Sequence, residues 1–239
     1  MSTNIDRVIL MARDFDIPVS VHQAELLLKH ISLVNEKNRT INLTRITSVD
    51  DAIDRHIVDS LLYLKQMSSL EDDSHLCDIG TGAGFPGIPI AIMTNFSIDM
   101  VDSVGKKVDC VNSFIEDLEL ADRCHAFHVR VEDLARSNDS KYEYVTARAV
   151  AKLRVLIEYA APLLAIGGFL IASKGNLTDE ELDDAIKTAK ICGMKIVSRE
   201  TFELPNESGH REILKVEKIK RSSVRLPRRT GEAKASPLF

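Results

Sequence analysis

The sequence predicts an α/β protein built around a mostly parallel sheet and preceded by a helical extension. From residue 75 onward, short apolar segments alternate with amphipathic ones, as in chains that form doubly wound sheets. The first 70 residues instead repeat apolar side chains at helical spacing. Two apolar segments near the C-terminus are joined by a loop too short for a crossover helix, so we expect an antiparallel hairpin there.

The helical extension, residues 1–70, is expected from two apolar stripes. Apolar side chains recur at steps of three and four residues, first as Ala24, Leu27, Leu28, Ile31 and Val34, and then as Ile53, Ile57, Leu61 and Leu64. A polar break at 35–42 separates the stripes, and a charged linker at 71–74 ends the extension. The extension should therefore consist of helices.

The sheet domain is expected to cover residues 75–219. Its expected strands are residues 75–79, 97–102, 124–129, 142–147, 168–173, 194–202 and 211–219. Its expected helices are residues 87–93, 105–120, 153–164 and 178–192, the last with a threonine N-cap and a glycine stop. Five parallel units followed by a hairpin resemble the Rossmann-like, seven-stranded sheet of class I S-adenosylmethionine-dependent methyltransferases. Residues 220–239 are expected to form a basic C-terminal tail.

A glycine-rich turn follows the first expected strand, with the sequence DIGTGAGFPG at residues 78–87. Glycines let the backbone approach a ligand closely, and the next helix offers free N–H groups. The GxGxxG spacing alone would also fit a nicotinamide-dependent oxidoreductase. Asp78 and Pro86 favour S-adenosylmethionine, because the acid can face an ammonium and the proline lacks the N–H that a pyrophosphate loop would use. Asp102, after the second strand, suits ribose hydroxyls in either case.

Further motifs accompany this turn along the chain. They are NLT at 42–44, RHIVDS at 55–60, DSVGKK at 102–107, RVE at 130–132, RA at 148–149, KG at 174–175 and PRRTGEAKASPL at 227–238. Together they resemble the bacterial small-subunit ribosomal RNA guanine-N7 methyltransferases, also called glucose-inhibited division protein B, over about residues 35–239. The chain departs from the family pattern at Ala233, usually proline, and at Lys107, commonly arginine. The resemblance implies methyl transfer from S-adenosylmethionine to N7 of one guanine in the decoding-region loop of 16S ribosomal RNA.

The cofactor-binding residues follow from the turn and from this resemblance. Those expected to bind S-adenosylmethionine are Asp78, Gly80, Gly82, Gly84, Phe85, Asp102, Ser103, Val131, Glu132 and Arg148. They lie at or after the carboxyl ends of the expected parallel strands, where open α/β sheets bind ligands.

Arg148 is also expected to act in catalysis by positioning the substrate. Guanine N7 carries a lone pair and no proton, so attack on a methyl group needs no general base. A guanidinium can hold a phosphate or the O6 edge of guanine in a fixed geometry. His56 could face the mouth of the cofactor site, or it could be a capping or packing histidine.

The net charge of −5, from 31 Lys and Arg against 36 Asp and Glu, at first argues against a nucleic-acid partner. Residues 1–214, however, carry a net charge of −11, and residues 215–239 carry +6. We therefore expect the tail to be free for RNA and to become ordered on its partner. The expected RNA contacts are Arg55, His56, Lys106, Lys107, Arg130, Lys174, Arg228 and Arg229.

The remaining composition indicates a cytoplasmic protein that holds no metal. Four cysteines, none in a CxxC pair, favour reduced thiols over a zinc site. No signal peptide or membrane span is expected, and we expect a monomer that meets 16S ribosomal RNA within a small subunit or an assembly intermediate. Open alternatives are a class I methyltransferase acting on another RNA, a protein or a small molecule, and an assembly factor with an inactive cofactor loop.

Overall fold

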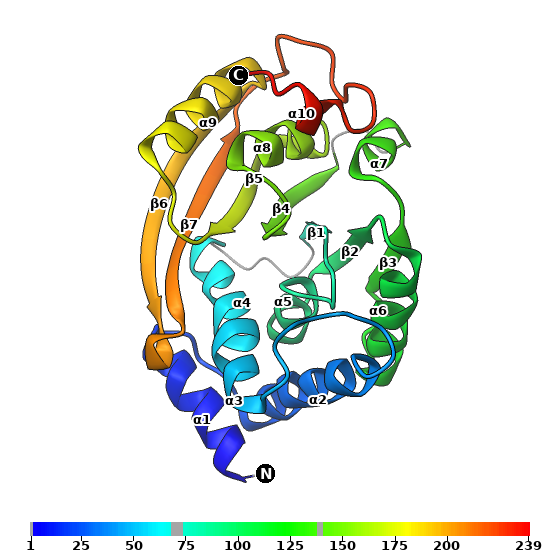
Figure 1. Cartoon of the computed structure of the whole chain (residues 1–239), viewed down its shortest axis with the longest axis vertical. Helices are drawn as coiled ribbons and strands as arrows, with labels where there is room; N and C mark the ends of the chain where they lie inside the picture. The colour runs from blue at the N-terminus through cyan, green and yellow to red at the C-terminus, as the bar shows by residue number, and fades with distance from the viewer. Residues whose placement is uncertain (1, 68–73, 138–140) are drawn as a thin grey trace.

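A computed structural model describes residues 2–67, 74–137 and 141–239. Within them, seven strands form one sheet in the order β3-β2-β1-β4-β5-β7-β6 (Figure 1). The strands are β1 His75–Ile79, β2 Ser97–Asp102, β3 Cys124–His128, β4 Tyr142–Arg148, β5 Leu164–Lys174, β6 Met194–Leu204 and β7 Gly209–Lys218. Neighbours among β1 to β5 are parallel, and β7 is antiparallel to β5 and β6. The predicted fold class is confirmed.

Helices cover both faces of this sheet. They are α1 Ser2–Arg13, α2 Val21–Lys37, α3 Val49–Ala52, the π-helix η1 Ile53–Val58, α4 Asp59–Leu61, the 3₁₀-helix η2 Leu62–Gln66, α5 Gly87–Met93, α6 Gly105–Asp117, α7 Val131–Ser137, α8 Leu153–Ala160, α9 Asp179–Ile191, the 3₁₀-helix η3 Pro205–Glu207 and α10 Glu232–Ala235. Figure 1 shows α8, α9 and α10 on one side and α2, α5 and α6 on the other. Of the described helices, none is both long and apolar enough to cross a membrane.

Alternation along the strands divides the core into two layers. In β1, Leu76 packs into the layer with α2, α5 and α6, whereas Cys77 and Ile79 pack into the layer with α8 and α9. Strands buried on both faces are expected where helices cover a parallel sheet on both sides. Because helices cover both faces, a site can form at the edge of the sheet where β1, β2 and β4 end and their loops begin.

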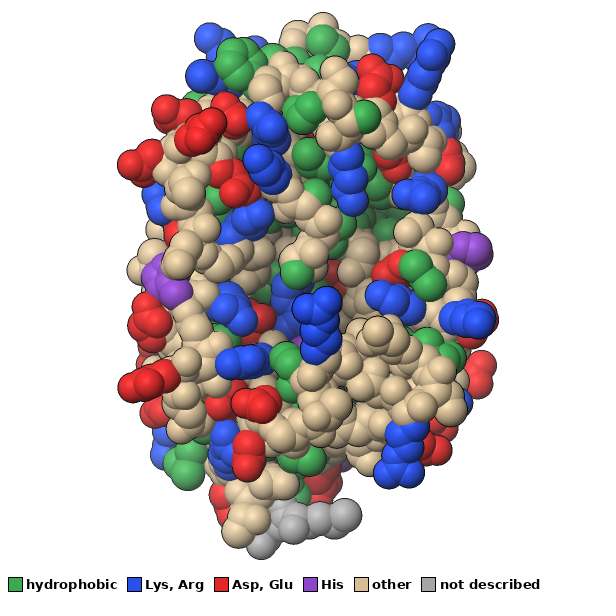
Figure 2. Space-filling model, in the orientation of Figure 1, with side chains coloured by type: hydrophobic (Ala, Val, Ile, Leu, Met, Phe, Trp, Pro, Cys, Tyr) green, Lys and Arg blue, Asp and Glu red, His purple; other side chains and the backbone are tan. Residues whose placement is uncertain are grey.

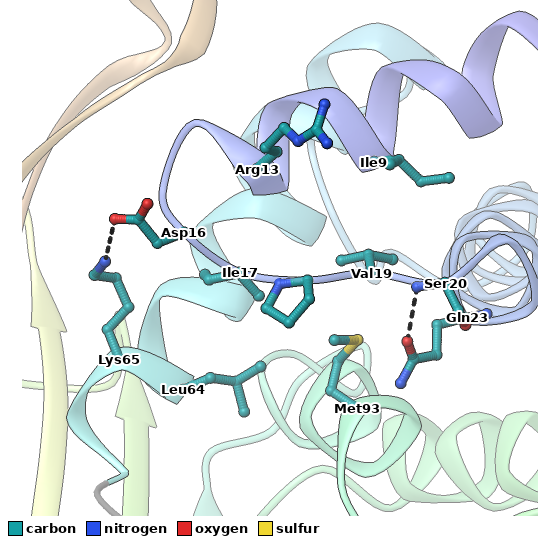
Figure 3. Close-up of a pocket in the computed structure, with 11 residues that line it drawn as sticks. Ile9, Arg13, Asp16, Ile17, Val19, Ser20, Gln23, Leu64, Lys65 and Met93 are labelled. Atoms are coloured by element: carbon teal, nitrogen blue, oxygen red, sulfur yellow. Dashed lines mark hydrogen bonds and ion pairs between the residues drawn. The ribbon is translucent and has the colours of Figure 1, made fainter.

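The helical extension packs on the first of these layers. Its core runs without a break from Val8 in α1 to Ile213 in β7. At the start of α2, Ser20 and Gln23 form a capping box, each side chain accepting the backbone N–H of the other. Figure 3 shows the mainly aliphatic groove of about 1120 Å³ that lies between α1, the link to α2, η2 and α5. The extension therefore contributes to the same core as the sheet.

Asp54 joins the extension to the hairpin at the other end of the chain. Its carboxylate, in η1, accepts from Arg7 in α1 at 2.9 Å. It also accepts from Asn206 at 2.9 Å and from Ser208 at 3.1 Å, both at the turn of the β6–β7 hairpin. The predicted boundary at residue 70 and most of the predicted linker, residues 71–73, lie outside the described residues.

Several elements differ from the expected ones, among them strand β5, which begins at Leu164 and not at residue 168. Helix α8 ends at Ala160, four residues early, because Pro162 follows and strand β5 already begins at Leu164. Helix α6 ends at Asp117, and Glu119 just beyond it adopts a φ of +59°. Helix α7 was not predicted, because seven residues show too little of a helical period.

The tail, residues 220–239, is folded onto the domain, which corrects the expectation that it orders only on a partner. The N–H of Ser223 donates to the carbonyl of Ile191 at 2.9 Å. The Arg228 guanidinium bonds both carboxylate oxygens of Glu158, and Ala233 is 2% exposed within the core beside α8. Charge composition misled the prediction, because it counted cations without showing that a buried acid pairs with one of them.

Candidate functional site

The glycine-rich turn between β1 and α5 has left-handed backbone conformations, which residues with a side chain rarely adopt. Gly80, Gly82 and Gly84 have φ values of +72°, +63° and +87°. The N–H of Gly80 donates to the carbonyl of Val101 at 2.8 Å, which holds the turn against β2. A Cβ added to Gly80 would lie 2.5 Å from Cγ2 of Val150. Glycine is therefore required at this position both for its conformation and for its lack of a side chain.

Asp78 lies fully buried beneath the turn. Its carboxylate accepts from the N–H of Gly87 at 3.2 Å and from the hydroxyl of Thr146 at 2.9 Å. Burial raises the pKa of Asp78 to about 6. Asp78 thus ties the turn to α5 and β4, and its predicted contact with a ligand ammonium stays a prediction.

Asp102 ends β2 and fixes the other side of the turn. One carboxylate oxygen accepts from the N–H of Gly82 at 3.0 Å, and the other accepts from the N–H of Val104 at 3.0 Å. Each carboxylate oxygen has a further lone pair. The held carboxylate can therefore still accept from the two hydroxyls of a ribose.

A cavity opens at the carboxyl ends of β1 and β2, beside the start of α7. Its lining is Ile79, Gly80, Val101, Asp102, Ser103, Val129, Arg130, Val131, Glu132, Ala149, Val150, Tyr159 and Lys234. Among the lining are five residues predicted to bind the cofactor: Gly80, Asp102, Ser103, Val131 and Glu132. The other five, Asp78, Gly82, Gly84, Phe85 and Arg148, lie in the turn, beneath it or at the neighbouring pocket. Arg130, predicted to contact RNA, also lines this cavity.

The cavity has the chemistry that an adenosine requires. Asp102 supplies acceptors for ribose, and Ile79, Val101 and Val150 supply apolar walls. Gly80 leaves the space that a side chain would fill. The residues present therefore fit the adenosine part of S-adenosylmethionine.

A second pocket shares Ala149 with the first cavity. Its lining is Ile46, Arg55, His56, Asp59, Arg148, Ala149, Ser173, Lys174, Gly175, Ser208 and Arg211. Arg148, at the end of β4, donates to the carbonyl of Arg55 at 3.0 Å, to the carboxylate of Asp59 at 3.3 Å and to Nδ1 of His56 at 3.2 Å. The predicted catalytic arginine therefore lies at the second pocket, held by three acceptors.

His56 is neutral and its tautomer is fixed by its partners. Arg148 can only donate, so Nδ1 of His56 accepts, and Nε2 donates to the hydroxyl of Thr44 at 3.0 Å. Burial, with the Arg148 charge adding to it, lowers the pKa of His56 to about 3. The ring stacks on Phe85 with centroids 4.4 Å apart. His56 is thus held by packing and by hydrogen bonds at the second pocket, and its predicted contact with RNA stays a prediction.

Three residues of this region were missed as site residues. Asp59 accepts from both Arg148 and Arg211, the latter at 3.0 Å, and only the RHIVDS motif pointed to it. Arg211 begins the last predicted strand, and no local pattern marked it. His30, in the apolar stripe of α2, is buried, donates to the carbonyl of Ala83 at 2.9 Å and packs on Phe85. Burial lowers its pKa to about 3, which keeps it neutral.

The predicted RNA contacts fall into two groups. Arg55, Lys106, Arg130 and Arg229 are exposed, and Lys107 is half-buried. Lys174 instead bonds Glu181 at 2.9 Å and the carbonyl of Ala151 at 3.1 Å, and Arg228 bonds Glu158. Lys174 and Arg228 are thus paired with carboxylates of the protein, and their predicted contacts with RNA stay predictions. Figure 2 shows lysine and arginine side chains around a hollow in the middle of one face, with many acidic side chains nearer its margins.

The strand order, the glycine turn after β1 and the acid ending β2 define the fold of the class I methyltransferases. Two solved structures share the fold. A geranyl diphosphate C-methyltransferase from Streptomyces coelicolor A3(2), in complex with S-adenosyl-L-homocysteine, has a TM-score of 0.54 and 10% identity over 67% of this chain and 78% of that one. The [4+2]-cyclase SpnF has a TM-score of 0.58 and 14% identity over 73% and 84%. Since one of them is a cyclase, the fold alone does not settle the reaction.

Sequence comparison identifies the family. The family described as rRNA small subunit methyltransferase G matches residues 23–211. Curated relatives named ribosomal RNA small subunit methyltransferase G include one from Desulfitobacterium hafniense, 38% identical over 96% of this chain and 95% of its own length, and one from Lactobacillus acidophilus, 37% identical over 90% of each. The chain belongs to this family, as the motifs predicted, and is a methyltransferase whose cofactor is S-adenosyl-L-methionine.

Proposed function

We propose that the protein methylates N7 of one guanine in the decoding-region loop of 16S ribosomal RNA. One observation carries the proposal: the cofactor cavity and the arginine-rich second pocket share Ala149, so a base in the second pocket would lie next to the cofactor. The curated relatives are named as methyltransferases of the RNA of the same ribosomal subunit. The chain would act as a cytoplasmic monomer on a small subunit or an assembly intermediate.

The chemistry of the second pocket suits guanine N7. When bound, S-adenosylmethionine supplies an electrophilic methyl group, and N7 supplies its own lone pair without losing a proton. His56 has both ring nitrogens bonded and is neutral, so it offers no base, and the reaction requires none. Arg148 is the residue that we assign to positioning, with its guanidinium directed at the O6 edge of the guanine or at a neighbouring phosphate, which leaves the N7 lone pair free to attack.

Rate enhancement would come mainly from alignment. Holding the nucleophile and methyl group within a few ångströms converts an encounter between two molecules into a reaction within one complex. Arg148 and its acceptors, Asp59 and His56, lie on separate elements that pack together. A folded pocket therefore presents the arginine in one geometry before RNA binds.

The test is to incubate the protein and methyl-labelled S-adenosylmethionine with small subunits from a strain that lacks the gene. We expect label in 16S ribosomal RNA, recovered as 7-methylguanosine at one nucleotide. Subunits from the parent strain, already methylated, should accept little label and serve as the control. Label recovered in protein, in a small molecule or in another RNA would favour the alternative substrates and contradict the proposal.

A further inference from the structure

The last 15 residues dock beside the cofactor cavity, on α8 and α7. We call residues 225–239 the strap. Its helix α10 lies beside α8 in Figure 1 and places Lys234 in the lining of the cavity. No sequence signal connected this lysine with the cofactor. The strap is held in place at two anchors, one on α8 and one on α7.

The first anchor is an ion pair between Arg228 and Glu158 of α8. The guanidinium donates to the two carboxylate oxygens at 2.8 and 2.7 Å, and a further nitrogen donates to Glu232 at 3.1 Å. The Glu158 side chain is 4% exposed, and that of Arg228 is 16% exposed. A bidentate pair that is largely withdrawn from water is a specific attachment.

The second anchor is on α7, which forms a wall of the cavity. Gly231, with a φ of +83°, donates its N–H to the carboxylate of Glu132 at 2.8 Å. The hydroxyl of Thr230 lies 3.2 Å from Asp133, and Arg136 donates to the carbonyl of Arg228 at 2.9 Å. Glu132 itself lines the cavity. The strap thus contacts a cavity residue directly and contributes another.

We propose that the strap is the outer wall of the adenosine end of the cavity, and that strap docking and cofactor binding stabilise each other. If the docked strap raises cofactor affinity by some factor, bound cofactor must favour the docked strap by the same factor. Two of the tail's cations, Arg228 and Lys234, then serve the cofactor site. This inference depends only on S-adenosylmethionine binding in the cavity, and it would stand if the methylated substrate were a different one.

The first experiment measures binding of S-adenosylhomocysteine by calorimetry. Arg228→Ala removes the first anchor, and Lys234→Ala removes an exposed side chain that the fold does not need. We expect the affinity to fall about tenfold for Arg228→Ala and several-fold for Lys234→Ala. Arg229→Ala is the matched control, since it removes one charge from the neighbouring, exposed position, and it should bind within twofold of the wild type.

The second experiment digests the wild-type protein with trypsin, which can cut the strap after Arg225, Arg229 and Lys234. When the strap docks and undocks faster than trypsin cuts, the cleavage rate is proportional to the undocked fraction. Saturating S-adenosylhomocysteine should then slow cleavage of the strap by about the same factor as the affinity falls in Arg228→Ala. Wild-type affinity in both strap variants would overturn the proposal. So would an equal loss in Arg229→Ala, or a strap cleavage rate that does not respond to the ligand.

Discussion

At the scale of single residues, Arg148 links the two halves of the site. It ends β4 beside the cofactor cavity, and its guanidinium is held by Asp59, by His56 and by the carbonyl of Arg55 in the second pocket. Its guanidinium lies over the ring of Phe85, with the guanidinium carbon 5.2 Å from the ring centroid. Arg148 is thus fixed without being fully buried, with 16% of its side chain exposed.

Replacement of Arg148 by alanine should reduce methylation sharply. A charge-assisted, bidentate contact contributes about 2–3 kcal/mol, so we expect the single-turnover rate on small subunits to fall about 100-fold. Arg148→Lys should recover little of it, because an ammonium lacks the fork geometry. The melting temperature shows whether the variant folds, and binding of S-adenosylhomocysteine separates a lost cofactor contact from lost positioning of the substrate. An alanine variant with the wild-type rate would refute the assignment.

Asp78 should make stability depend on pH in a defined direction. Folding raises its pKa from 3.8 to about 6, so the folded state binds this proton more tightly than the unfolded state. Its contribution is therefore most favourable below pH 3.8 and is lost as the pH rises through about 6. Two pKa units correspond to about 3 kcal/mol.

The measurement compares urea unfolding of the wild type with that of Asp78→Asn between pH 4 and pH 7. The difference between their free energies of unfolding isolates Asp78, because other titrating groups contribute to both proteins. We expect the wild type to lose about 3 kcal/mol relative to the variant as the pH rises. A constant difference, or one of opposite slope, would show that burial does not raise this pKa.

At the scale of elements, the glycine turn depends on a side chain from another loop. Val150, which follows β4, occupies the space that a Cβ of Gly80 would need. Gly167 also has a positive φ, +88°, but a Cβ there would meet nothing within 4 Å. A side chain at Gly80 would meet both backbone strain and a steric collision, whereas one at Gly167 would meet strain alone.

Gly80→Ala should weaken S-adenosylhomocysteine binding at least tenfold, because both strain and collision displace the cavity wall. Gly167→Ala should cost about 1 kcal/mol of stability through strain and leave the affinity within twofold. Calorimetry and thermal unfolding measure the two effects. Equal affinity in the two variants would mean that the turn adapts to a side chain.

Local patterns account for the elements that could be predicted. The period-two strands, the glycine spacing and the short hairpin loop are each visible within about 20 residues, so Gly80 and Asp102 could be named from the local pattern. Ser103, Val131 and Glu132 followed from the family resemblance. The contact between Asp59 and Arg211 spans 152 positions, and that between Arg228 and Glu158 spans 70. No local period encodes such pairs, which is why the second pocket and the docked tail required the folded chain.

At the scale of the whole molecule, the location of charge matters more than its sum. The net charge is −5, yet the lining of one pocket combines four cations, Arg55, Arg148, Lys174 and Arg211, with a single carboxylate, Asp59. Many acidic side chains in Figure 2 lie nearer the margins of that face. Clustered cations can attract a polyanion even when the protein is acidic overall.

Salt dependence tests this view of RNA binding. Each phosphate contact contributes about 0.7 to 0.9 to the slope of log affinity against log salt. Arg55→Ala should reduce the slope for small-subunit RNA by about that amount. Arg13→Ala, an exposed position in the groove of Figure 3, should leave it unchanged. Equal slopes in all three proteins would exclude Arg55 from the interface.

The three hydrogen bonds to Asp54 bear on how cooperatively the protein unfolds. They hold the first helix, the π-helix and the tip of the last hairpin at one buried carboxylate, and one core runs from Val8 to Ile213. Regions that share a core and such a junction should lose their structure together. Calorimetry should therefore record a single melting transition, with the helices of the extension and the sheet disappearing at one temperature.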